Sequence, residues 1–107
     1  MEFIDKLKQI TAWDIEPSLT ESELEELLAA AALVDASGFD PAHEEWTPTY
    51  DLNAAASAAW LIKAARAAAT VEVDPPESGL FTSKVFENCR AMARIYAAKR
   101  KFTATAI

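Results

Sequence analysis

The chain has 107 residues, of which 51% are apolar, and it carries a net charge of −7 at pH 7. Its length accommodates one domain, so we expect a single domain over residues 1–107. Alanine supplies 23 of the apolar residues, which makes the core thin and favours stabilisation through assembly. Two glycines provide little material for hairpin turns or phosphate-binding loops, and the acidic balance argues against general nucleic-acid affinity. These features favour an all-α fold.

The charge is divided unevenly along the chain. Residues 1–51 contain 13 acidic and two basic side chains, whereas residues 52–107 contain four acidic and eight basic ones. This polarity suits head-to-tail contact between copies, with the acidic end of one against the basic end of the next. The alternative is a pair of ordinary solvated faces.

The single cysteine, Cys89, excludes an internal disulfide and fits a reducing compartment. An amphipathic, charged segment follows Met1, so the N-terminus does not resemble a signal peptide. The apolar run over residues 54–62 is too short to cross a bilayer and ends at Lys63. We therefore expect a soluble intracellular product without membrane contact.

The first predicted helix covers residues 2–12 and is short and amphipathic. A helix of this length needs packing partners to persist. Pro17 marks a boundary after it, because proline disfavours helical geometry in the preceding residue. The apolar stripe of this helix consists of Phe3, Ile4, Leu7 and Ile10.

The second predicted helix begins with a capping box. Thr20 and Glu23 have the spacing at which each side chain reaches the other's free backbone amide. The buried stripe of the helix is predicted to continue to Val34, with Gly38 as the C-terminal stop. Residues 38–50, with two prolines, are predicted to form a long loop, and loops of this length are often functional or bound to a partner.

The central helix is predicted over residues 51–71, with Asp51 as its N-cap and alanine at ten of its 21 positions. Because so many of its side chains are single methyl groups, neighbouring helices can approach it closely on several sides. After it, Val71 and Val73 alternate with acidic residues and two prolines follow, so a short extended link is predicted over 72–81.

The last helix is predicted to start at Thr82 or Ser83 and to run to about Phe102. Cations gather at its C-terminal end, where they complement the helix dipole. Residues 98–107 combine this basic end with an apolar tail that lacks a helix stop, and we interpret them as a docking arm. The side chains expected inside the core shared by the central and last helices are Trp60, Phe86, Met92 and Tyr96.

Three groups of residues are candidates for chemistry. His43 and the two glutamates after it invite a metal hypothesis, but with one histidine and no paired cysteines a solvated acidic loop is favoured. Cys89 lies on an apolar helix face and is interpreted as a buried structural thiol rather than a nucleophile. We expect no cofactor, no metal and no enzymatic activity. Three arginines can in principle hold an anionic substrate, and otherwise face solvent or pair with glutamates of the second helix: Arg66, Arg90 and Arg94.

Two motifs in the second half of the chain resemble those of a known family. Asp51 to Ala64, DLNAAASAAWLIKA, matches the pattern Asp-(Leu/Val)-Asn-Ala-Ala-Ala…Trp-x-Ile-Lys-Ala. Lys84 to Ala97, together with Ser83 before them, match the pattern (Lys/Ser)-x-Val-(Phe/Tyr/His)-Glu-x-Cys-x-x-Met-Ala-x-x-Tyr-Ala. The stretch from residue 51 to 101, about half of the chain, thus resembles tailed-bacteriophage head–tail connector proteins. It departs from them between the helices, where an aspartate–glycine turn is usual and this chain has VDPPESG.

The resemblance implies a non-enzymatic virion protein of the phage neck, made in the host cytoplasm. Such connectors are small helical proteins that assemble as rings, commonly of twelve copies, under the portal protein. They extend the DNA channel, through which DNA passes without specific binding, and they present a surface to the next neck or tail protein. The alternative is a small helical adaptor or regulatory module that binds a host protein.

Two groups of side chains are predicted to contact the portal or a neighbouring subunit. One group lies at the basic C-terminal end and its apolar tail, and the other lies in the aromatic loop over 38–50. The expected architecture is a four-helix domain with long central and C-terminal helices and little or no β structure. The predicted interface residues are Lys99, Arg100, Lys101, Phe102, Ile107, Phe39 and Trp46.

Overall fold

The computed structural model describes residues 2–73 and 76–100, and the side chains of these residues outside 70–83. Within these ranges the chain forms no strand, and Ala32 and Tyr50 make one isolated antiparallel bridge. The predicted all-α fold with four helices is therefore confirmed. The helices are α1 (Glu2–Thr11), α2 (Glu21–Ala30), α3 (Leu52–Val73) and α4 (Pro76–Lys99).

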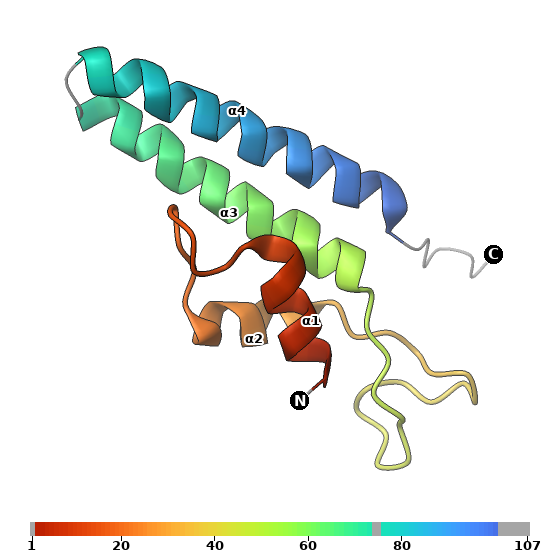
Figure 1. The fold of residues 1–107 in the computed structure, drawn as a ribbon. Helices are drawn as coiled ribbons and strands as arrows, with labels where there is room; N and C mark the ends of the chain where they lie inside the picture. The colour runs from red at the N-terminus through yellow and green to blue at the C-terminus, as the bar shows by residue number, and fades with distance from the viewer. Residues whose placement is uncertain (1, 74–75, 101–107) are drawn as a thin grey trace.

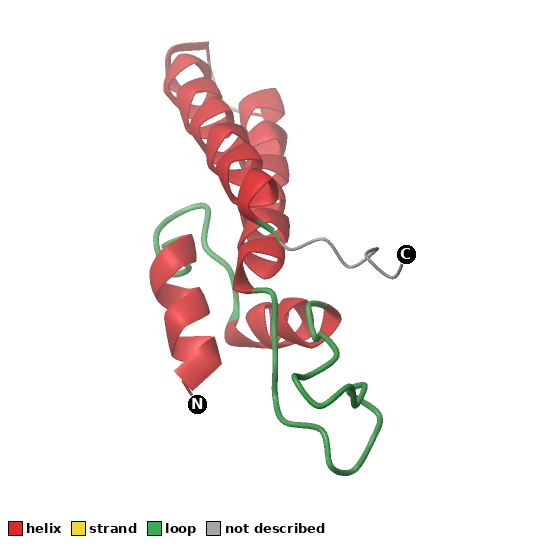
Figure 2. Cartoon of the chain, turned by 90° about the vertical axis from the view of Figure 1, so that its right-hand side faces the viewer, coloured by secondary structure: helices red, strands yellow, loops and turns green. Residues whose placement is uncertain are grey.

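Helix α3 is the element that every other helix contacts. α4 packs antiparallel along one side of α3, while α1 and α2 pack on the other side and on each other (Figure 1). Within the described part of the chain, α4 contacts no helix except α3. The α3/α4 hairpin extends past α1 and α2, and the loop before α3 extends the other way (Figure 2). The molecule is consequently elongated, with principal extents of 54 × 29 × 18 Å.

The seam between α3 and its neighbours is made of small side chains. Ala56 and Ala59 are fully buried, and the hydroxyl of Ser57 donates to the carbonyl of Ala93 on α4 at 2.9 Å. Side chains this small let two helix backbones approach closely. The four large residues predicted inside the core of α3 and α4 are therefore only partly there: each is half-buried, and Tyr96 packs against the buried cluster. These four residues are Trp60, Phe86, Met92 and Tyr96.

Helix α1 ends in a left-handed turn. Ala12 has a φ of 46°, a conformation that costs a non-glycine residue about 1 kcal/mol. The amide of Trp13 donates to the carbonyl of Lys8 at 3.5 Å, as in the Schellman motif. Thr11 is buried and its hydroxyl donates to the carbonyl of Leu7 at 2.7 Å. The chain therefore turns back sharply after α1, and carbonyls along the turn point toward Lys63 of α3.

Helix α2 begins where the capping box predicted it and ends earlier than predicted. The amide of Thr20 donates to Glu23 Oε1 at 2.8 Å, and the amide of Glu23 donates to Thr20 Oγ1 at 3.1 Å. The helix stops at Ala30, so Val34 is 56% exposed rather than part of a buried stripe. Gly38, with a φ of 90°, lies in a separate turn and does not cap α2.

The predicted extended link over 72–81 is wrong. α3 continues to Val73 and α4 already begins at Pro76, so only residues 74–75 separate the described ends of the two helices. Proline is well tolerated at the first position of a helix, because the amide it lacks would have no partner within the helix there. Two prolines after α3 are therefore as compatible with the start of a new helix as with the end of an extended segment.

The two long helices contain 22 and 24 residues, enough to cross a bilayer by length alone. Charged side chains interrupt both, including Lys63 and Arg66 in α3. Over the described parts of the chain, no helix combines the length and the hydropathy of a membrane span.

Enlarging a seam residue should destabilise the fold. Ala56→Leu places three extra carbon atoms where no surface is exposed, and we expect the free energy of unfolding to fall by roughly 1–3 kcal/mol. Urea denaturation measures this change. Ala65→Leu, at an exposed position of the same helix, is the matched control and should change stability by less than about 0.5 kcal/mol. Equal stability of the two variants would contradict a tight seam at Ala56.

Candidate functional site

Lys63 of α3 holds the turn that follows α1. Its ammonium donates hydrogen bonds to the carbonyls of Ala12 at 2.9 Å, Ile15 at 2.7 Å and Pro17 at 2.8 Å. The residue is only 1% exposed, and the three bonds use all the donors that an ammonium has. Burial lowers the pKa of Lys63 below its ordinary value. Lys63 therefore has a structural role: its ammonium binds three backbone carbonyls of this turn.

Two further residues of α3, three positions to either side, bind the same segment. The indole of Trp60 donates to the carbonyl of Ile10 at 3.3 Å, and its ring centroid lies 5.3 Å from the Lys63 ammonium. The guanidinium of Arg66 donates to the carbonyl of Ser18 at 2.9 Å. We call Trp60, Lys63 and Arg66 the α3 anchor. It ties α3 to the last turn of α1 and to the backbone between α1 and α2.

The α3 anchor also reaches α2. Arg66 forms a bidentate ion pair with Glu23, in which Nη1 lies 3.0 Å from Oε1 and Nη2 contacts Oε2. Hydrogen bonding to Arg66 lowers the pKa of Glu23 to about 2, and the same contact raises the pKa of Arg66. Arg66 thus pairs with a glutamate of α2, which was the structural alternative to binding an anionic substrate. Arg90 and Arg94 are exposed.

Other residues of the two motifs also make internal contacts. Asp51 caps α3 by accepting the amide of Ala54 at 3.1 Å, as predicted. The side-chain amide of Asn53 donates to the carbonyl of Lys99 at the end of α4, at 3.3 Å. Cys89 is buried, as predicted for a structural thiol, and burial raises the pKa of this thiol.

The predicted C-terminal interface residues are only partly within the described chain. Lys99 and Arg100 are exposed at the end of α4, and the Lys99 ammonium lies 5.5 Å from the ring centroid of Tyr96. Lys101, Phe102 and Ile107 lie outside the described residues. The docking arm itself thus stays a prediction.

The predicted interface residues of the loop are both half-buried. Phe39 stacks on His43, with ring centroids 4.2 Å apart. The indole of Trp46 donates to the carbonyl of Leu33 at 2.8 Å. The hydrogen bond between Asn53 and the end of α4 brings this loop and the basic helix end to the same end of the molecule (Figure 1).

Asp35 organises this loop and had no predicted role. Its carboxylate accepts the amides of Ser37 at 2.9 Å, Phe39 at 3.0 Å and Thr47 at 2.8 Å. These hydrogen bonds, led by the one from Thr47, lower the pKa of Asp35. A signal was present, because aspartate followed three residues later by Gly38 is typical of a type I turn. The amide of Gly38 closes that turn onto the Asp35 carbonyl at 3.0 Å.

The histidine of the loop is exposed and takes part in a local turn. His43 Nδ1 accepts the amide of Glu45 at 3.0 Å. In the parts of the chain that the structure describes, no three histidine, cysteine, aspartate or glutamate side chains come together as metal ligands would.

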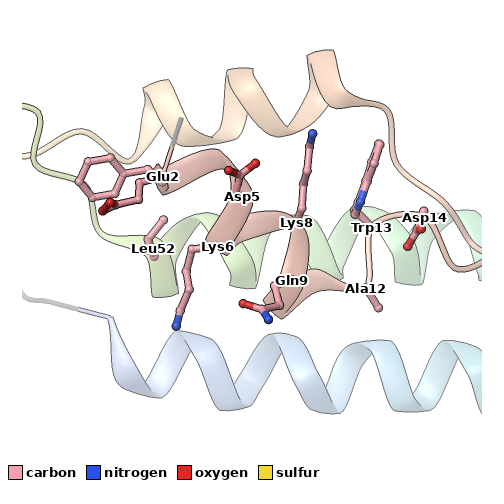
Figure 3. Close-up of a pocket in the computed structure, with 10 residues that line it drawn as sticks. Glu2, Asp5, Lys6, Lys8, Gln9, Ala12, Trp13, Asp14 and Leu52 are labelled. Carbon is pink, nitrogen blue, oxygen red and sulfur yellow. The ribbon is translucent and has the colours of Figure 1, made fainter.

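Two clefts border α1. The wider one, about 770 Å³, is lined by α1, by the turn after it and by Leu52 of α3 (Figure 3). Its lining mixes charges of both signs, and Lys6 and Lys8 point to opposite sides of α1, so no set of reactive groups converges there. A second cleft of about 370 Å³ lies between α1 and α2.

Removing the Lys63 ammonium should weaken the fold. In Lys63→Met the aliphatic stem is kept, whereas three carbonyls lose their donor, so we expect the free energy of unfolding to fall by about 2–4 kcal/mol. Chemical denaturation followed by circular dichroism measures it. Lys6→Met, at an exposed position, should change stability by no more than about 0.5 kcal/mol. A loss that small in Lys63→Met would show that solvent satisfies these carbonyls.

The ion pair between Glu23 and Arg66 should make stability depend on acid. The pKa of Glu23 is about 2 in the folded chain and 4.5 ordinarily, so the unfolded chain binds more protons between these values. Stability from this group is present above pH 4.5 and is lost as the pH falls toward 2. We therefore expect the free energy of unfolding of Glu23→Gln to fall less steeply than that of the wild type across this range. Parallel profiles would contradict the assigned pKa.

Comparisons with protein-family models, with curated proteins and with solved structures find no match for this chain. An inference about function therefore depends on the contacts described above and on the resemblance carried by the α3 and α4 motifs.

Proposed function

We propose that this chain is a structural connector of a phage neck, which assembles as a ring on the portal, extends the DNA channel and joins head to tail. One observation carries the proposal: the residues that resemble the connector motifs are those that build the α3/α4 hairpin and attach it to the rest of the fold. Asp51 caps α3, Asn53 reaches the end of α4, and Lys63 holds the turn after α1. The motif therefore specifies a fold rather than a reactive centre.

The shape of the chain supports an assembling part. A subunit of a ring needs contact surfaces on two different sides. Here α4 and the pair α1 and α2 lie on opposite sides of α3 (Figure 1). The α4 side keeps apolar area in the single copy, because Ile95 is 47% exposed and Phe86 and Met92 are only half-buried. Burial of such area between copies stabilises an assembly.

The acidic balance suits a channel that DNA traverses. The loop between α2 and α3 exposes Asp40, Glu44 and Glu45, and the chain as a whole carries a charge of −7. Carboxylates facing a channel repel phosphates, which prevents DNA from binding to the wall during passage.

Electron microscopy with a portal protein encoded in the same genome tests the proposal. We expect negatively stained portal particles to gain a ring of extra density when this chain is added. Lys99→Glu combined with Arg100→Glu should weaken portal binding about tenfold, because both cations are exposed at the predicted docking end. The control is Lys6→Glu combined with Lys84→Glu, which makes the same charge change at two exposed positions outside the predicted interface. A chain that never joins the portal particle would favour the host-protein adaptor instead.

A further inference from the structure

The cleft between α1 and α2 has the lining of an arginine site. Two carboxylates on α2 stand beside an apolar floor, within a volume of about 370 Å³. An arginine side chain matches both features, since its aliphatic stem packs on apolar surface while its guanidinium pairs with a carboxylate. The residues that line this cleft are Ile4, Glu21, Glu25, Leu28, Ala29 and Tyr50.

One of the two carboxylates is available to an incoming cation. Glu21 is engaged by Lys8 of α1, whose ammonium lies 3.2 Å from its carboxylate. Glu25 is exposed, and in the described part of the chain it makes no ion pair and no side-chain hydrogen bond. Among the residues that the structure describes, the cleft therefore presents one unpaired carboxylate beside apolar side chains.

The α4 surface carries a matching group. Arg94 is exposed and has no carboxylate partner among the described residues, and beside it Ile95 is 47% exposed. Two other cations of α4 lie over aromatic rings: Arg90 is 5.6 Å from the centroid of Phe86, and Lys99 is 5.5 Å from that of Tyr96. Arg94 and Ile95 thus offer a cation and an apolar side chain next to each other.

These two surfaces cannot meet within one molecule. α4 packs on one side of α3, and the cleft between α1 and α2 lies on the other side (Figure 1). A contact between them joins two copies through different surfaces, so it leaves one cleft and one α4 face open for further copies. Repeated contacts of this kind produce a closed ring or an open chain.

We propose that the cleft between α1 and α2 binds Arg94 and Ile95 on α4 of a second copy of this chain. This contact rests on the proposed function in one respect: in a ring of the proposed kind, it is the contact between neighbouring subunits. Glu25 pairs with the guanidinium of Arg94, and Ile95 covers the apolar floor around Leu28. The unequal charges of the two halves of the chain serve this contact.

A charge swap tests the contact on the isolated full chain. Sedimentation velocity at low salt should show self-association of the wild type that weakens as salt is added. Glu25→Lys and Arg94→Glu should each weaken it at least about tenfold, because each places like charges together. An equimolar mixture of the two variants should associate as the wild type does, since each cleft then meets an opposite charge. That recovery also shows that both variants are folded.

Two matched variants complete the experiment. Glu26→Lys and Lys84→Glu make the same charge changes on the same helices at exposed positions outside the cleft and away from Arg94, and should associate as the wild type does. A wild type that stays monomeric up to about 1 mM overturns the contact. A mixture that fails to recover the association overturns the contact too, as does an Arg94→Glu variant that self-associates as the wild type does. The self-association experiment contains no portal protein, so its result is independent of portal binding. A chain that self-associates but does not bind the portal would contradict the proposed function and not this contact.

Discussion

The fold depends on one buried cation. The turn after α1 points its carbonyls inward, and acceptors without donors in such a place would oppose folding. Lys63 supplies donors to three of them, across 46 to 51 residues of sequence. The left-handed residue Ala12 gives one of the three carbonyls, so the same contact holds this unfavourable backbone conformation in place directly after α1. Without this ammonium, the polar contacts of the α3 anchor with the N-terminal segment would be those of Trp60 and Arg66 alone.

The small side chains of α3 allow it to serve both of its sides. Alanine at the seam lets α4 lie close enough for the Ser57 hydroxyl to reach a backbone carbonyl of α4. The larger side chains Trp60, Lys63 and Arg66 are reserved for the side that holds the N-terminal segment. A helix that is uniform in composition is therefore divided in function: methyl groups set the spacing of the hairpin, and three long polar side chains attach the rest of the chain.

Local signals predicted much of the fold. The capping box of Thr20 and Glu23, the Asp51 cap and the buried Cys89 depend on residues close in sequence or on one helix face, and all three are present. The end of α2 was not predicted, because it is decided by backbone pairing with residues far along the chain and by the carboxylate of Asp35. The partners of Lys63 are carbonyls, which carry no residue identity, so no sequence pattern could have pointed to them. The cleft beside Glu25 could not be predicted either, because it forms only where α1 packs on α2.

The polar attachment of the hairpin lies at the middle of α3. The α3 anchor spans Trp60 to Arg66, with eight residues of α3 before it and seven after it, roughly 10 Å of helix on either side. A tilt of α3 about the anchor would therefore move the two ends of the hairpin in opposite directions and by similar amounts. A partner bound near Lys99 would thereby also displace the far end of the hairpin.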